Sequence, residues 1–385
     1  MSTTTGGSAD HHVGSLDGLR ALAALWVYLS HVALLTGMRI LPVLSWGDMA
    51  VDLFMMISGF LMAHHYLHRR DREPWSAPAT WRAFWLRRFF RIAPAYYLLL
   101  IVALLIGPWL GDCRTLIAGP FPGTTTPIER YTDASLANIA VHATFVFGAL
   151  PAYAFRTPLP DWSIGLEMQF YAVFPFLMLL IGVRGRALRL ALAVALAFAA
   201  LWLFRGYGAR FEMPAFLGLK LQVFLIGVLL AYGRRGGFTP VSAALIAGIV
   251  LFEAWRQGGV HGACFALLVL GFGLLVAGPA QSRPLQRVRA ALSTPLASQA
   301  GEYAYCLYLI HLLWLIPVAG LLTLQPWYLE LKGVLRFLTC IALSLPPTLL
   351  CCAAIYRFVE TPGIQLGKRL VAGRRQLTAP AAAHP

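Results

Sequence analysis

Long apolar runs, separated by short polar segments, recur along the whole chain of 385 residues. The runs are continuous rather than alternating, which is typical of membrane helices and not of the strands of a barrel. About 17–25 apolar residues are enough for a helix to cross a bilayer. On this pattern the sequence predicts about ten spanning helices, over residues 16–36, 47–68, 92–110, 163–183, 187–204, 215–233, 240–255, 262–278, 302–322 and 333–358.

One further apolar stretch, Asn138–Leu150, is too short to span a membrane. We predict that it is a re-entrant or interfacial segment on the outer side. Lys and Arg collect in alternate loops, and such loops tend to stay in the cytoplasm. The sequence therefore predicts an all-α polytopic membrane protein with cytoplasmic N- and C-termini. We expect residues 1–13 to be disordered, and residues 366–385 to form a basic cytoplasmic tail that is partly disordered.

Composition agrees with this class, because 59% of the residues are hydrophobic, only 12% are charged, and the mean hydropathy is +0.69. The excess of 31 Lys+Arg over 16 Asp+Glu would suggest nucleic acid in a soluble protein. In a membrane chain it fits basic cytoplasmic loops, so no nucleic-acid partner is expected. Five of the six cysteines lie in apolar runs, where Cys acts as a small hydrophobe. We predict neither a disulfide nor a metal site, and no signal peptide.

The first predicted helix carries two polar residues that mark candidate chemistry, Arg20 and His31. Their spacing places them about 16 Å apart along the helix and about three turns apart, hence on nearly the same face. An ionisable side chain within a membrane helix is costly and often functional. His31 is therefore a candidate catalytic base, although a lone histidine is more often a satisfied structural residue.

Arginines at the predicted cytoplasmic end of the third helix form a second candidate site. Arg88 and Arg91 are three residues apart and share a helix face. With Arg20 they predict a cytoplasmic pocket for a polyanion, because guanidinium groups bind phosphate in a bidentate manner. The alternative is that these arginines only fix topology or touch lipid headgroups, and for Arg82 and Arg87 we favour that interpretation.

Four more polar residues lie in apolar runs near these sites. Asp52 and Glu167 could fix the tautomer of His31 and make it a better base, or bind a hydroxylated acceptor. Ser58 is a candidate substrate contact, but with Gly59 it could equally permit close helix packing. His311 is a candidate substrate contact as well, with polar packing as the alternative.

These residues stand in motifs that resemble the acyltransferase 3 family of bacterial integral-membrane acyltransferases. Arg20, ten residues and His31 resemble its first-helix signature, and Arg88 and Arg91 match its RxxR motif. Further similar segments, in the same order as in the family, are VDLFMMISGF (with Ala50 before it where the family has Gly), WSIGLEMQFY, YCLYLIH and RFVETP. The resemblance extends over residues 14–365, which would form one transmembrane acyltransferase domain.

The resemblance implies acyl transfer, typically of acetyl, from acyl-CoA to a hydroxyl of a carbohydrate or other acceptor at the bacterial inner membrane. Arg20, Arg88 and Arg91 would bind the CoA phosphates. His31 would act as general base or accept the acyl group, with Asp52 or Glu167 as its support. Acyl-CoA would be a substrate, with no cofactor bound permanently. The rival hypothesis is a transporter or flippase for an anionic or glycan substrate, although the halves show no matching repeats.

Overall fold

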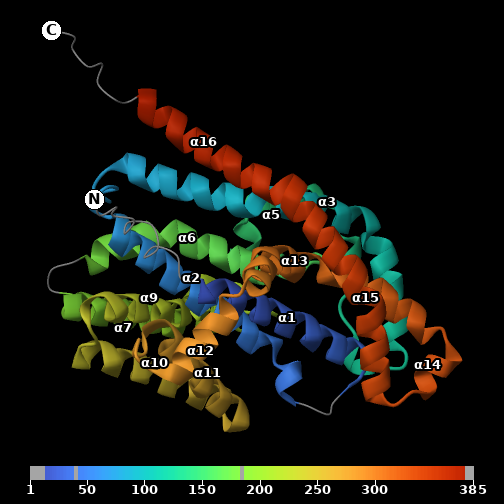
Figure 1. Cartoon of the computed structure of the whole chain (residues 1–385). Helices are drawn as coiled ribbons and strands as arrows, with labels where there is room; N and C mark the ends of the chain where they lie inside the picture. Colours follow the sequence, from blue (N-terminus) through green and yellow to red (C-terminus); the bar gives the residue numbers. More distant parts are fainter. Residues whose placement is uncertain (1–13, 39–41, 183–185, 378–385) are drawn as a thin grey trace, which may run out of the picture.

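The apolar runs of the sequence become the helices of a bundle, shown in Figure 1. The computed structural model describes residues 14–38, 42–182 and 186–377, and this part of the chain contains helices and loops but no strand. The longer helices are α1 (Ser15–Leu35), α2 (Gly47–Arg69), α3 (Pro78–Ala118), α6 (Trp162–Ile181), α7 (Arg186–Leu203), α9 (Leu221–Gly236), α10 (Pro240–Gln257), α11 (Gly259–Ala277), α12 (Arg283–Leu292), α13 (Pro295–Thr323), α15 (Gly333–Ile355) and α16 (Thr361–Leu377). The shorter helices and helical turns are η2 (Pro42–Ser45), η3 (Pro122–Thr124), α4 (Glu129–Thr132), α5 (Leu136–Ala143), η4 (Val146–Ala149), α8 (Arg205–Gly208), η5 (Leu217–Leu219), α14 (Pro326–Glu330) and the π-turn η6 (Tyr356–Glu360).

Within the described residues, seven helical segments are long and apolar enough to cross a membrane. They are α1, α2, α3, α6, α11, α13 and the segment Gly333–Ala372 that begins with α15. This confirms an all-helical, multi-pass membrane protein. The other three predicted spans also form helices, α7, α9 and α10, which fall short of these length or hydropathy criteria. The total of about ten spans and the cytoplasmic position of both termini therefore stay predictions.

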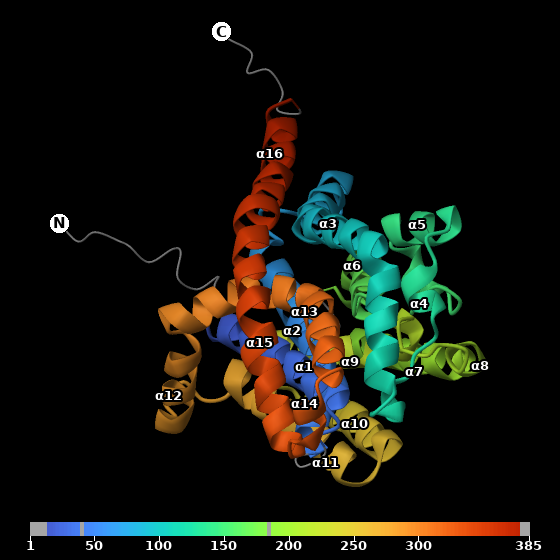
Figure 2. The same ribbon diagram turned by 90° about the vertical axis from the view of Figure 1, so that its right-hand side faces the viewer.

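α3 is much longer than the predicted third span. It covers 41 residues, or about 60 Å of helix, twice the thickness of the hydrocarbon core. Residues 78–91, which precede the predicted span, form its first third. The residues between Pro78 and Pro94 include no helix breaker, and their alanines, arginines and leucine are good helix formers, so the helix begins at Pro78. Figure 2 shows α3 as two segments at an angle, as expected for a helix with interior prolines.

The C-terminal region is helical over part of the segment that we expected to be a basic, partly disordered tail. The chain continues from the π-turn η6 into α16, which is helical to Leu377 and packs along α3. Gly363 and Gly367, one helical turn apart, allow this close contact, because a Cβ at either would meet Pro94 or Phe90 of α3. The predictions for residues 1–13 and 378–385 lie outside the described residues.

The short apolar segment Asn138–Leu150 does not form a spanning helix, as predicted. It is divided between α5, which has 8 residues, and η4, which has 4. The break falls at Phe145, whose backbone is left-handed with φ of 59°. A helix of this length covers about 12 Å, far less than the bilayer thickness. Its placement on the outer side of the membrane stays a prediction.

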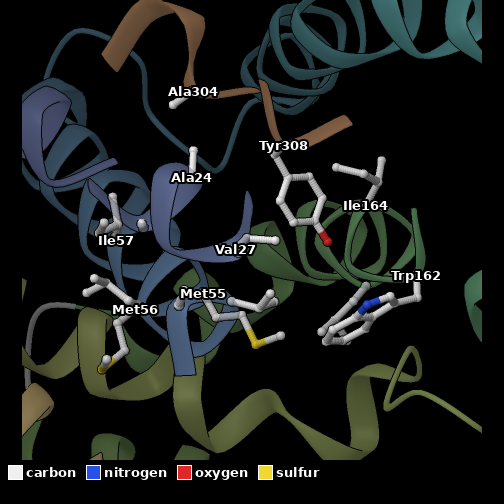
Figure 3. Close-up of a cluster of buried hydrophobic side chains, with 14 of the residues drawn as sticks. Ala24, Val27, Met55, Met56, Ile57, Trp162, Ile164, Ala304 and Tyr308 are labelled. Atoms are coloured by element: carbon white, nitrogen blue, oxygen red, sulfur yellow. The ribbon is translucent and has the colours of Figure 1, made fainter. Parts of the chain in front are cut away.

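α1 lies inside the bundle, in contact with α2, α13 and α15 (Figures 1 and 2). Its buried face meets apolar side chains of α2 and α13 in the core drawn in Figure 3. Among the labelled residues of that core are Ala24, Val27, Met55, Met56, Ile57, Ala304 and Tyr308. The helix that carries Arg20 and His31 is therefore held rigidly on several sides.

Glycines let α2 and α9 (Leu221–Gly236) approach closely. A Cβ at Gly227 of α9 would overlap the Met56 carbonyl of α2, and a Cβ at Gly59 would overlap the Phe224 carbonyl of α9. Small residues commonly allow such contacts between membrane helices. Gly59 is thus a packing residue, as the alternative interpretation of the Ser58-Gly59 pair proposed.

We predict that Gly227→Ala destabilises the protein by about 1–3 kcal/mol, because the added methyl group forces α2 and α9 apart. The intrinsic helix propensity of alanine alone would give the opposite sign. Gly248→Ala in α10 is the matched control, since its Cβ would meet nothing within 4 Å. Thermal unfolding in detergent measures both variants. Equal unfolding temperatures for Gly227→Ala and wild type would contradict the close packing.

Candidate active site

A cavity of about 380 Å³ lies between α1, α2, α3, α6 and α13, and we call it the arginine cavity. Arg20, Arg88 and Arg91 line it together, as their helix positions predict. Among the residues that the structure describes, none of the three guanidinium groups has a hydrogen-bond or ion-pair partner. Arg88 lies 5.8 and 5.5 Å from the ring centroids of Phe84 and Tyr171, which are favourable contacts for a cation. Three unpaired cations in one cavity favour an anionic ligand.

The neighbouring arginines of the basic segment do not join this group. Arg87 forms an ion pair with Glu73, with 3.0 Å between Nη2 and Oε2, and Arg82 is exposed. Arg82 lies about half a turn around α3 from Arg91, whereas Arg87 is only about 40° from Arg91. The ion pair with Glu73, and not the helix face, therefore keeps Arg87 out of the group. This agrees with the interpretation that Arg82 and Arg87 have no part in the pocket.

Carboxylates also line the arginine cavity, and that of Glu167 accepts hydrogen bonds from two neighbouring hydroxyl groups. Ser58 donates a hydrogen bond of 3.0 Å to Glu167, and the Tyr171 hydroxyl donates to the same carboxylate oxygen. Asp17, Glu302 and Glu360 are the other acidic residues of the lining. The cavity therefore offers cationic groups for phosphate together with acceptors for N–H and O–H donors. Ser58 lines the cavity while Gly59 packs, so each half of the pair has a different role.

A second cavity of about 580 Å³ contains His31, and we call it the histidine cavity. Residues of α1, the start of α2 and the segment 120–124 line it, together with Trp162 and Tyr308. Ser30, Ser45 and Asp48 supply polar groups beside the apolar wall. Val51 and Tyr308 line both cavities, so the two spaces meet at these side chains.

The imidazole of His31 is held by two acceptors at the same nitrogen. Nδ1 of His31 lies 3.0 Å from the Val27 carbonyl and 3.2 Å from Nε2 of His311. Nδ1 of His311 lies 3.1 Å from the Leu307 carbonyl. A carbonyl only accepts, so Nδ1 carries the proton in both neutral rings, and Nε2 of His311 is an acceptor. This arrangement leaves Nε2 of His31 without a proton, in the state that a general base requires.

The position of His311 differs from the predicted substrate contact. Its side chain is fully buried and lines neither cavity. Its ring centroid lies 4.9 Å from that of His31. His311 follows Tyr308 by three residues on α13, and its ring lies against His31 of α1 and not in either cavity. We therefore assign His311 as a residue that positions His31, which is the role we expected of a carboxylate.

Neither expected carboxylate supports His31. Asp52 is buried and pairs with Lys220 of the α9 N-terminus, with 2.6 Å between Oδ1 and Nζ. It lines neither cavity, so the structure does not place it beside His31 as we expected. The reason is the helix face, since Asp52 points from α2 toward α9. Glu167 lines the arginine cavity and is bonded to Ser58 and Tyr171 instead of His31.

Sequence reasoning missed several cavity residues that helical periodicity indicates. The face of α2 that lines the arginine cavity contains Val51, Phe54, Met55, Ser58, Leu61, Met62 and His65. These positions follow the spacing of three and four residues that defines one helix face. Starting from Ser58, that pattern selects His65 and excludes Asp52. Tyr308 is missed as well, because the sequence of an apolar run does not indicate which of its tyrosines lines a cavity.

Comparison with known proteins supports the class of enzyme. The family model described as an acyltransferase domain matches residues 13–357. The chain belongs to the acyltransferase 3 family. This acyltransferase is 24% identical over 323 residues to the acyltransferase MdmB of Streptomyces mycarofaciens, covering 77% of both chains. It is 26% identical over 175 residues to the peptidoglycan O-acetyltransferase OatA of Listeria monocytogenes, covering 44% of this chain and 24% of OatA. No solved structure matches significantly.

Family membership makes the chain a membrane acyltransferase and decides against the rival transporter as its principal activity. The matched region contains every residue of both cavities except Glu360 and Ile364. The two cavities are therefore properties of the acyltransferase domain itself.

We predict that Asp52→Asn destabilises this acyltransferase by about 3–5 kcal/mol, because the buried Lys220 ammonium loses its counter-ion. The double variant Asp52→Asn with Lys220→Met removes both charges and should recover most of the loss. Thermal unfolding of the purified variants measures the effect. If Asp52→Asn keeps its stability but loses acyl transfer, the structural assignment fails and a catalytic one is restored.

Proposed function

We propose that this acyltransferase moves an acyl group, in the simplest case acetyl, from cytoplasmic acyl-CoA to a hydroxyl of a carbohydrate or other envelope acceptor. The observation that carries the proposal is the pairing of two cavities. One holds three guanidinium groups without partners, and the adjoining one holds a histidine whose Nε2 is unprotonated. We place the protein in the bacterial inner membrane, because there one side of it is in contact with the cytoplasm that supplies acyl-CoA.

The arginine cavity fits the donor. The phosphates of acyl-CoA would bind Arg20, Arg88 and Arg91, which are unpaired and reach one space. The pantetheine arm carries amide N–H and hydroxyl donors, and the Glu167 carboxylate held by Ser58 is an acceptor for them. From Arg20 to His31 the arm would cover about 16 Å along α1. The donor would thus extend from the arginines toward the histidine cavity.

The histidine cavity fits the acceptor. A hydroxyl next to His31 would give its proton to Nε2 while its oxygen attacks the acyl carbon. The carbon–sulfur bond then breaks, CoA leaves as a thiolate, and the proton held by His31 neutralises it. His311 keeps Nδ1 of His31 occupied and so fixes the tautomer throughout. A covalent acyl-histidine at Nε2 is the alternative route and uses the same nitrogen.

We predict that Arg88→Ala and Arg91→Ala each weaken acetyl-CoA binding about tenfold to a hundredfold, since a charge-assisted bond contributes about 1.5–3 kcal/mol. Lysine at either position should restore little, because it lacks the planar fork. Arg82→Ala is the control, since Arg82 is exposed and lines neither cavity. Calorimetry on purified protein measures the dissociation constants. Equal affinities for all variants, or no binding by the wild type, would refute the donor site.

We predict that His31→Ala lowers acyl transfer by at least about a hundredfold, as expected for loss of a general base, while acetyl-CoA binding stays within twofold of the wild type. His311→Ala should lower transfer less, because Nε2 of His31 remains present but loses its fixed orientation. The assay follows radiolabelled acetyl from acetyl-CoA into the envelope glycan fraction of membranes that contain each variant. Full transfer by His31→Ala would end the proposed mechanism.

A further inference from the structure

Tyr308 occupies the boundary between the two cavities. It is one of the residues that line both of them. Figure 3 shows its ring between Val27 of α1 and Ile164 of α6, with the hydroxyl directed toward Trp162. Val27 and Trp162 line the histidine cavity, whereas Ile164 lines the arginine cavity. With Val51, this side chain therefore lies where the two spaces meet.

Two hydrogen bonds fix the ring across this boundary. The Tyr308 hydroxyl donates to the Pro160 carbonyl at 2.7 Å, and its oxygen lies 2.7 Å from Oγ of Ser163. Because the single hydroxyl proton goes to the carbonyl, Ser163 is the donor in the second bond. The ring also contacts Phe54 on α2, with 6.0 Å between centroids, and lies 6.3 Å from the His311 ring. Tyr308 is thus held at both its polar tip and its faces.

The partner of this tyrosine is itself immobilised by buried charges that the proposed mechanism does not use. Arg130 donates from Nε to the Thr157 carbonyl at 2.9 Å and from Nη2 to the Leu159 carbonyl at 3.4 Å. The Thr157 hydroxyl donates to Asp161 at 2.8 Å. Arg130 and Asp161 are buried, and their bonds enclose the short segment that presents the Pro160 carbonyl. Burying two charged side chains is costly, and here it yields a rigid acceptor for Tyr308.

We propose that Tyr308 is a gate between the donor and acceptor cavities. With its hydroxyl bonded, the ring separates the thioester from His31 and from water in the histidine cavity. The gate opens when the hydroxyl leaves Pro160 and Ser163 and the ring rotates, which lets the acyl end reach His31. The separation of the cavities follows from the geometry alone, whereas its consequence for the thioester rests on the proposed function.

The gate suppresses a side reaction. In an open passage, His31 would remove a proton from water, whose oxygen would bond to the acyl carbon. The carbon–sulfur bond would break, and CoA would leave as a thiolate that takes the proton from His31. The products are a free carboxylic acid and CoA, so the acyl group is lost. Excluding water from a reactive intermediate is a common role of closed active sites.

Cysteine labelling tests the gate without any substrate. Ser58→Cys places a thiol in the arginine cavity, and a membrane-impermeant thiol reagent is added to the membrane face that carries Asp48. Asp48→Cys identifies that face, because the Asp48 side chain is 58% exposed. Labelling is measured above the background of the parent chain. We expect Tyr308→Phe, which removes both hydrogen bonds, to speed labelling of Ser58→Cys by about tenfold, and Tyr308→Ala to speed it further.

Tyr305→Phe is the matched control. Tyr305 lies on the same helix and lines the arginine cavity, but its hydroxyl donates to the Ile92 carbonyl of α3 at 2.9 Å, away from the boundary. It should leave the labelling rate unchanged. If Tyr308→Phe does not fold, Ser163→Ala removes one of the two bonds and should give a smaller increase. Unchanged labelling in all Tyr308 and Ser163 variants overturns the gate.

Acetyl-CoA hydrolysis without acceptor tests the consequence. We expect Tyr308→Phe to release CoA thiol several-fold faster than the wild type, and the double variant with His31→Ala to return to the background rate. If Tyr308→Phe speeds labelling but the wild type does not bind acetyl-CoA, the gate is retained and the proposed function is overturned. If the wild type binds acetyl-CoA but Tyr308→Phe hydrolyses it no faster than the wild type does, the Tyr308 ring does not protect the thioester from water. That result would overturn the protective role of Tyr308.

Discussion

The rigid separation of Arg20 and His31 along α1 is the constraint on which the rest of the site depends. A helix packed against α2, α13 and α15 cannot change the distance of about 16 Å between the two side chains. A ligand that contacts both must therefore be long, and Arg20 favours an anionic group at its end of the ligand. The two cavities meet at Val51 and Tyr308, so such a ligand could extend from one cavity into the other. Acyl-CoA has this form, which is why we propose it as the donor.

The polar residues inside the bundle fall into two groups that differ in how their charges are balanced. Asp52 with Lys220, and Arg130 with the carbonyls of residues 157–159, are satisfied internally and stabilise the structure. The three arginines of the first cavity have no such partners among the described residues. Since a partly buried charge without a partner is costly, these are positions at which an anionic ligand can contribute to stability. Whether a charged side chain has a partner inside the protein therefore separates structural charges from candidate binding groups more reliably than residue type does.

Much of this was predictable from the sequence, and the failures have physical causes. Hydropathy identified the apolar helices but not α12 or α16, and helical spacing correctly placed the two arginines of α3 in one pocket with Arg20. Asp52 was expected beside His31 because its depth in the membrane was considered and its face on α2 was not, and the structure places it against Lys220 instead. His311 was expected at a substrate, yet contact with His31 depends on how α13 packs against α1, which no local pattern encodes. The length of α3 was missed because an arginine-rich segment resembles a loop while remaining a good helix former.

The most direct test of the account is a cryo-electron microscopy structure of the protein with a non-hydrolysable acetyl-CoA analogue. The account predicts phosphate density within hydrogen-bond distance of Arg20, Arg88 and Arg91, a pantetheine arm beside Ser58 and Glu167, and the acyl end at Nε2 of His31 beyond a displaced Tyr308 ring. An analogue bound with its phosphates away from these arginines, or with its acyl end on a path that does not lead to His31, would contradict it.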